Sequence, residues 1–143
     1  MNTKFQSNYK IKNYIYFDKL KGEFLVPKHN LKSLFKKEIP HHIKDIQRIK
    51  LVTDTDYKDT FLGTKEVCME ICLMIVLPND DRCYIDFLDK PTFSNSLKCK
   101  KAFQDAQEVI SALKFMQKVG EYQKQRKISK EVYLSSRMLA GNV

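Results

Sequence analysis

Residues 66–88, EVCMEICLMIVLPNDDRCYIDFL, constrain the fold of this 143-residue chain more than any other stretch. The sequence Pro-Asn-Asp-Asp at 78–81 is typical of a turn between two strands. After the turn, apolar residues alternate, which predicts that Cys83, Ile85 and Phe87 face the core. Before it, every odd position from 67 to 77 is apolar. The stretch is therefore predicted to form a β-hairpin whose odd-numbered face is buried.

The same pattern predicts how the two strands pair, because a slip of one residue would turn a whole face towards solvent. We expect the partners Leu77–Cys83, Ile75–Ile85 and Leu73–Phe87. This register leaves a short loop centred on Asn79-Asp80-Asp81. The first strand is apolar on nearly both faces, which indicates either a central position in a sheet or a strand half covered by another element.

Three of the four cysteines lie in this hairpin, and their spacing speaks against a shared site. Cys68 and Cys72 are expected on one strand face with Cα atoms about 13 Å apart. That separation is too long for a disulfide and for two ligands of one zinc ion. Cys83 points to the opposite face, and Cys99 falls in a later helix. We interpret all four as small core residues and predict no metal ligands and no cofactor.

The residues before the hairpin supply the rest of a sheet. Strands at 13–18 and 23–27, joined by a turn at 19–22, are expected to form a first hairpin. The other segments are a short strand or helical turn within the basic residues 28–40, a brief segment at 41–46, a strand at 47–53 with Ile49 and Leu51 inward, and a polar loop at 54–63.

After residue 93 the apolar period changes from two to between three and four, which predicts an amphipathic helix of about six turns. Ser94 or Ser96 is expected to cap it, and Gly120 to end or kink it. Its apolar residues are Leu97, Ala102, Phe103, Ala106, Val109, Ile110, Leu113, Met116 and Val119. Ser129 is expected to cap a short final helix. Strands followed by helices predict the α+β class, with one domain at 1–119 and a basic extension at 120–143.

The segments YIYFDKLKGEFLVP, IKDI, CMEICLMIVLPNDDRCYIDFL and FSNSLKCKKAFQDAQEVISALKFM, in this order, resemble a PH-like domain over about residues 10–118. The version in question occurs in uncharacterised proteins of Gram-positive bacteria and their mobile elements. The resemblance implies a bent antiparallel sheet, a partly open barrel, closed by a C-terminal helix. It also implies an adaptor that binds a protein partner. The chain lacks the Cys-pair zinc ribbon often found before such domains and carries extra residues after the helix.

The net charge is +9, and 22 of the 26 basic residues are Lys. Such a charge suits an anionic partner, although Lys matches phosphate less closely than Arg does. The candidate binding residues form three clusters: Lys28, Lys32, Lys36 and Lys37; Lys98, Lys100 and Lys101; and Lys124, Arg126, Lys127 and Lys130. The second cluster opposes the helix macrodipole, which indicates either an anionic partner there or a solvated helix end.

Membrane association is not expected. The longest apolar run, 71–78, is far shorter than the roughly 20 residues of a membrane helix, and the first residues do not resemble a signal peptide. A cytoplasmic location is therefore predicted. The turn Lys19-Leu20-Lys21 lacks the Arg residues expected of a phosphoinositide site.

Candidate catalytic groups are scattered. His29, His41 and His42 have no partner spacing typical of a metal or a catalytic triad, and Asp54, Asp56 and Asp59 lack the Gly and Glu of a calcium loop. We predict no enzyme activity and no catalytic residues. The expected function is a non-catalytic adaptor that binds a protein partner. The alternative is a nucleic-acid- or nucleoprotein-binding protein of a phage or mobile element, for example an inhibitor of a host defence complex. The sequence predicts no oligomeric state.

Overall fold

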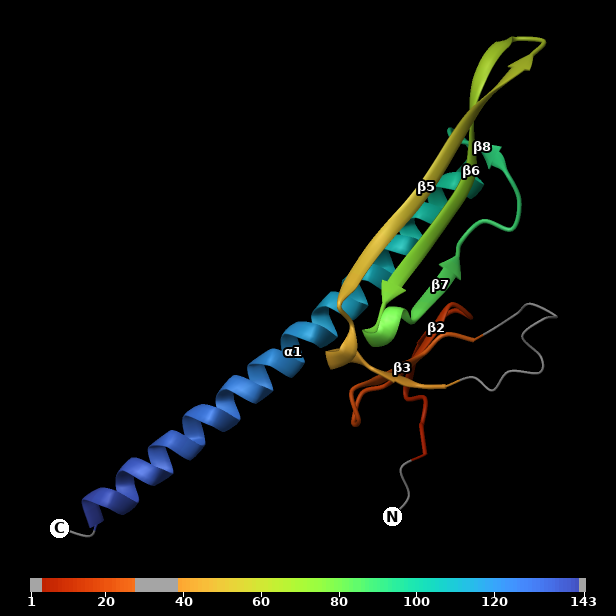
Figure 1. Cartoon of the computed structure of the whole chain (residues 1–143). Coiled ribbons are helices and arrows are strands. Elements are labelled where there is room, and N and C mark those ends of the chain that lie inside the picture. The colour runs from red at the N-terminus through yellow and green to blue at the C-terminus, as the bar shows by residue number, and fades with distance from the viewer. Residues whose placement is uncertain (1–3, 28–38, 142–143) are drawn as a thin grey trace.

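The computed structural model describes residues 4–27 and 39–141, with the backbone alone at 122, 131 and 133–141. Two antiparallel four-stranded sheets are followed by one long helix, α1 (Leu97–Gly141), which confirms the predicted α+β class. Figure 1 shows the first sheet at the base of the second, and α1 running along one face of the second sheet. The strands thus form two unclosed sheets where one bent sheet was expected.

The first sheet has the strand order β1-β2-β3-β4 and is built mainly from the predicted first hairpin. Its strands are β1 (Tyr9–Ile11), β2 (Ile15–Asp18), β3 (Glu23–Leu25) and β4 (His41–His42), and a 3-10 turn, η2 (Ile43–Asp45), follows. Asp18 faces Glu23 across the β2–β3 turn, which confirms the hairpin. Gly22 in this turn has φ +65°, a backbone conformation that glycine adopts without steric cost.

The second sheet has β6 at its centre, as its two apolar faces indicated. Its strands are β5 (Arg48–Thr60), β6 (Gly63–Val76), β7 (Arg82–Asp86) and β8 (Thr92–Phe93), with a 3-10 turn, η3 (Pro78–Asp80), between β6 and β7. β5 and β7 flank β6, and β8 pairs with its beginning. Ile49 and Leu51 of β5 are half-buried against the core, as predicted.

The predicted polar loop at 54–63 is wrong, because most of it is strand. Asp54–Thr60 continue β5 and pair with the first half of β6, so that only Phe61 and Leu62 form the turn. This part of the hairpin extends beyond the sheet, and its side chains are mostly exposed on both faces (Figure 1). A strand exposed on both faces has the same polar composition as a loop, and the sequence pattern did not distinguish them.

The predicted β6–β7 register is wrong by two residues. Ile75 pairs with Cys83 and Leu73 with Ile85, whereas Ile85 and Phe87 were the expected partners. The turn causes the shift: the Leu77 amide donates to the Asp81 carbonyl at 2.8 Å, and Asn79 and Asp80 both adopt positive φ. A shift of two residues preserves the faces. Leu73, Ile75 and Ile85 are therefore buried as predicted.

A β-bulge corrects the predicted placement of two cysteines. Asp54 pairs with Glu70 but Thr55 pairs with Cys68, so that Met69 is an extra residue in β6. An extra residue reverses the faces beyond it. Cys68 therefore lies in the core beside Cys99 of α1, while Cys72 lies on the outer face of the sheet. Cys68, Cys72 and Cys99 are buried thiols, and Cys83 is half-buried.

The helix begins where the sequence predicted and continues further. The Ser96 hydroxyl accepts a hydrogen bond from the Cys99 amide at 3.1 Å, which identifies Ser96 as the N-cap. Helical conformation then continues through Gly120, and the residues of the expected final helix belong to the same element, which has 45 residues. Gly120 therefore neither ends nor interrupts α1, and the helix crosses the expected boundary between domain and extension.

Candidate functional site

The first half of α1 is fixed to the body of the protein by a single buried stripe. Cys99, Ala102, Ala106, Val109 and Leu113 follow one another at steps of three and four, and each is at most 4% exposed. They belong to one core cluster with residues from both sheets. We call residues 97–117 the anchored segment of α1. This packing determines the direction in which the rest of the helix leaves the body.

A polar contact adds to the anchor on the side of the first sheet. The Lys12 ammonium donates hydrogen bonds to both carboxylate oxygens of Asp105 at 2.8 Å, and the Tyr14 hydroxyl donates to the same carboxylate at 3.3 Å. The hydrogen bond with Asp105 raises the pKa of Lys12. Burial, followed by the charge of Asp105, raises the pKa of Tyr14. This contact ties the β1–β2 turn to the anchored segment.

The second half of α1 leaves the body. Every described side chain from Lys118 to Lys130 is exposed, and Figure 1 shows this part extending away from both sheets. We call residues 118–141 the projecting segment. At about 1.5 Å per residue it is about 36 Å long. Among its described side chains, Val119 is 36%, Ile128 51% and Val132 61% exposed.

The local sequence explains why this segment is helical without packing. Residues 121–130, EYQKQRKISK, contain no Gly or Pro and are mostly Glu, Gln, Lys and Arg, which have favourable helix propensities. Gly120 costs about 1 kcal/mol relative to Ala in a helix interior. A Cβ atom at Gly120 would meet nothing within 4 Å, so that close packing does not require glycine here.

The charge of the projecting segment is strongly positive. Residues 118–130 contain five basic side chains, at 118, 124, 126, 127 and 130, and one acidic side chain, Glu121, a net charge of +4. At about 100° per residue the five cations cover about 240° of the helix circumference. Glu121, Gln125, Ile128 and Val132 lie on the remaining face. The segment therefore combines one face without cations, which we call the cation-free face, with cations on both flanks and behind it.

The structure separates the three predicted basic clusters. Lys28, Lys32, Lys36 and Lys37 lie outside the described residues. Lys98, Lys100 and Lys101 are exposed at the start of α1, and Lys98 makes an ion pair with Asp89 at 2.9 Å that lowers the Asp89 pKa. Lys124, Arg126, Lys127 and Lys130 lie on the projecting segment, about 39 Å along the helix from Lys98. Of the two clusters that the structure describes, the last lies on a part of α1 that has left the core and the other does not.

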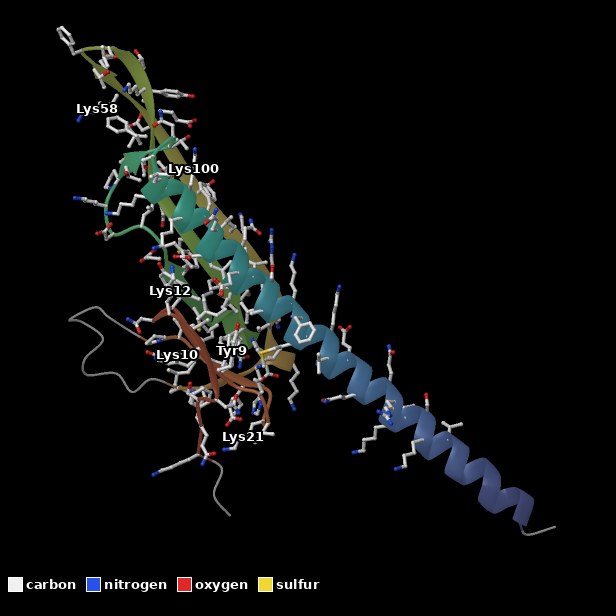
Figure 2. All side chains as sticks on the ribbon, turned by 180° about the vertical axis from the view of Figure 1, so that it is seen from behind. Tyr9, Lys10, Lys12, Lys21, Lys58 and Lys100 are labelled. Carbon is white, nitrogen blue, oxygen red and sulfur yellow. The ribbon has the colours of Figure 1, made fainter. Side chains whose placement is uncertain are left out.

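A fourth basic group was not predicted. Lys10 lies in β1, Lys12 in the β1–β2 turn and Lys21 in the β2–β3 turn at the other end of β2, and Figure 2 labels all three on the first sheet. The Lys12 ammonium donates a hydrogen bond to Asp105, and the Lys21 ammonium donates a hydrogen bond to the Lys4 carbonyl. Lys19 lies over the Tyr9 ring, 4.3 Å from its centroid.

The tip of the β5–β6 hairpin is a second exposed element. Phe61 is fully exposed and Leu62 is 81% exposed at the turn. Lys58 and Lys65 face each other directly just below it, a like-charge pair that is unfavourable across two strands. The sequence did not reveal this element, because the turn had been placed within a longer loop.

One group of possible metal ligands meets on the outer face of the second sheet. Among the described residues, ligand atoms of Glu70, Cys72 and Asp86 lie within 4.8 Å of one another. Cys72 faces Asp86 directly in the observed register. The predicted register placed Leu88 opposite Cys72 and thereby concealed this group. These residues could hold a divalent cation, but only after the thiol loses its proton.

The thiols are poor nucleophiles in this environment. Burial, followed by the charge of Asp86, raises the pKa of Cys72 to about 12. Burial, followed by the neighbouring Cys99, raises the pKa of Cys68 to about 11. Both thiols are therefore protonated at neutral pH, whereas a nucleophilic cysteine reacts as the thiolate.

The candidate catalytic groups are dispersed. His29 lies outside the described residues. In β4 the His41 ring lies 5.6 Å from the Phe24 ring, and His42 lies 3.9 Å from the Glu23 carboxylate. Asp54, Asp56 and Asp59 are exposed along β5, where Asp59 accepts a hydrogen bond from Thr64 at 2.8 Å. They are strand residues rather than the turn residues that the sequence predicted.

A groove of about 880 Å³ separates β7 from the first sheet. Its lining includes apolar rings, acidic groups and basic groups. Tyr14, His41, Tyr84 and Lys98 are among the lining residues. Pro27 and Ile39 also line the groove, and both border residues 28–38, which lie outside the described residues. Because the groove adjoins this range, we place the candidate site on the projecting segment and not in the groove.

The one long helix in the described part of the chain, α1, is too polar to cross a membrane.

Comparison with known proteins gives no relative from which a role could be transferred. No family model matches the chain, and no curated protein or solved structure matches it either.

Proposed function

We propose that this protein is a non-catalytic binding protein that contacts an anionic macromolecule through the projecting segment of α1. The observation that supports it is the exposure of every described side chain from Lys118 to Lys130, on a helix whose other half is buried in the core. A polar helix without packing is marginal unless it bridges to something else. A partner would supply the missing contacts. We also propose that the protein acts in the cytoplasm.

The sign of the charge determines what kind of partner fits. Five cations and one carboxylate in residues 118–130 would repel a second copy of the same segment. An acidic surface would instead be attracted and would approach faster at low ionic strength. The outer face of the second sheet, where Glu70 and Asp86 are exposed, does not offer this attraction. The anionic partner is therefore assigned to α1 and not to the sheet.

Heparin chromatography tests this function with two matched variants. The helix variant is K124Q/R126Q/K127Q/K130Q, and the body variant is K44Q/K50Q/K58Q/K90Q, which removes the same charge from other exposed positions. Gln retains helix propensity close to that of Lys and Arg. We expect the helix variant to elute at much lower salt than the wild type and the body variant to elute close to it. Equal losses would mean that net charge alone binds heparin, and the proposed site would be wrong.

A second candidate function is the predicted adaptor that binds a protein partner, and the hairpin tip favours it. Phe61 and Leu62 form a small exposed apolar knob on an arm that reaches beyond the sheet. Such a knob suits an apolar pocket on another protein. The variant F61S/L62S should abolish capture of a defined partner and leave heparin retention unchanged. A partner captured equally well by the variant would exclude the tip as its contact.

A further inference from the structure

We infer that the anionic partner of the projecting segment is a B-form DNA duplex, with the helix lying in the major groove. This inference rests on the proposed function and names its partner. It starts from size: an α-helix with its side chains is about 10–12 Å across, and the major groove of B-DNA is about 12 Å wide. A bare helix of about 36 Å, free of other described elements, can enter such a groove.

The distribution of charge favours a groove over a flat acidic surface. An acidic protein surface would contact one stripe of the helix, and a single row of cations would suffice. In the projecting segment the cations instead cover about 240° of the circumference. Lys118 and Lys124 border the cation-free face on its two sides. A helix in a groove has phosphates along both walls, which is the arrangement that cations on both flanks match.

The cation-free face is the side that would turn towards the bases. It carries Gln125, whose amide can form hydrogen bonds to a base edge, and Glu121, whose carboxylate can accept a hydrogen bond from the N4 amino group of cytosine. It also carries Ile128 and Val132, which are 51% and 61% exposed and can contact thymine methyl groups. One amide, one carboxylate and two apolar groups read little sequence, and most of the affinity is then electrostatic. The segment is thus suited to DNA binding of low sequence specificity.

Groove geometry also distinguishes DNA from RNA. The major groove of A-form RNA is deep and narrow, and side chains on a helix of ordinary width do not reach its bases. An acidic protein and heparin have no groove at all. A helix that requires a groove should therefore prefer B-form DNA to duplex RNA of equal length and charge.

Fluorescence anisotropy with the full chain tests the inference. The probes are a DNA duplex of about 20 base pairs, an RNA duplex of the same length and a polyglutamate peptide. Each phosphate contact contributes about −0.9 to the slope of log affinity against log salt. Three to five contacts predict a fall of about 40-fold to 500-fold between about 50 and 200 mM salt. We expect DNA to bind at least about tenfold more tightly than RNA or polyglutamate.

Two pairs of variants make the geometry testable without disturbing the body. K124Q/R126Q/K127Q/K130Q should lose the salt-dependent DNA binding, while K44Q/K50Q/K58Q/K90Q should retain it. Q125P keeps every charge but breaks the helix, and Q125A is its control. We expect Q125P to lose at least about tenfold in DNA affinity while retaining heparin binding. An unchanged melting temperature would show that the body is intact.

The outcomes separate the inference from the function on which it rests. Equal affinity for DNA and RNA, stronger binding to polyglutamate, or unchanged DNA binding by Q125P would overturn the DNA inference while the anionic-partner function stands. Failure of the wild type to bind DNA, RNA, polyglutamate and heparin at low salt would overturn both.

Discussion

Both halves of α1 are helical, but different interactions stabilise the helix in each half. In the anchored segment, Ala102, Ala106, Val109 and Leu113 are almost fully buried, and tertiary packing stabilises the helix. In the projecting segment, every described residue from Lys118 to Lys130 is exposed, and only local propensity acts. A continuous helix can therefore be part of the core at one end and an independent surface at the other. Substitutions in the two halves should therefore have unequal effects.

The largest expected difference is between buried and exposed apolar residues. Leu113 is completely buried, whereas Ile128 is 51% exposed. L113A should lower the free energy of unfolding by about 2–5 kcal/mol, because it leaves a cavity in the core. I128A should change it by less than about 0.5 kcal/mol. Urea denaturation of both variants measures these values, and a loss above 1 kcal/mol for I128A would show that the projecting segment packs on the body.

Two serines on α1 provide the next contrast. Ser96 caps the helix through its hydrogen bond from the Cys99 amide, whereas Ser129 is an exposed residue within the helix. S96A should cost about 1 kcal/mol of stability, within a range of 0.5–2. S129A should cost nothing and should raise the helix content slightly. Thermal unfolding followed by circular dichroism compares them, and a cap effect at Ser129 would indicate that two helices meet there.

The contact between Lys12, Tyr14 and Asp105 predicts an alkaline loss of stability. The pKa values of Lys12 and Tyr14 are both raised in the folded protein, so that the folded state holds these protons more tightly than the unfolded state. Their stabilisation is complete below the unfolded pKa values of 10.5 and 10.0 and is lost as the pH rises through the higher folded values. Other groups also titrate in this range, and D105N serves as the control. The difference in stability between wild type and D105N should shrink above pH 10. A difference that stays constant up to pH 12 would exclude this contribution.

The smallest expected effect on global stability is at Gly120. G120A should stabilise the projecting segment locally by about 1 kcal/mol and increase helical ellipticity. The melting temperature of the body should not change, because a Cβ atom at this position would meet nothing within 4 Å. If G120A raised the melting temperature of the body as much as a stabilising substitution in the core would, the two halves of α1 would unfold as one unit.

The sequence predicted which faces of the strands are buried better than it predicted which residues pair across the strands. Alternation of apolar residues identified Leu73, Ile75 and Ile85 as buried, and a register error of two residues left those faces unchanged. The register itself depended on the positive φ values of Asn79 and Asp80, which no apolar pattern reports. The same error concealed the contact between Cys72 and Asp86.

The candidate site was predictable in composition and not in geometry. The cluster from Lys124 to Lys130 was named from charge alone and was placed in an extension after residue 119, but its position on a helix continuous with the core was not expected, because Gly120 suggested a break. The bulge at Met69, which moves Cys68 into the core, had no signal in the sequence pattern. Helix propensity and long-range packing decide these features together, and only the first can be read locally.

Hydrogen exchange measured by mass spectrometry tests the division of α1 most directly. Amides at 102–113 should exchange only through global unfolding, and amides at 121–130 should exchange by local opening at rates that are orders of magnitude faster. Addition of the DNA duplex should slow exchange at 121–130 and leave 102–113 unchanged. Equal and strong protection of both segments in the free protein would contradict the account, because it would mean that the projecting segment is already packed against the body.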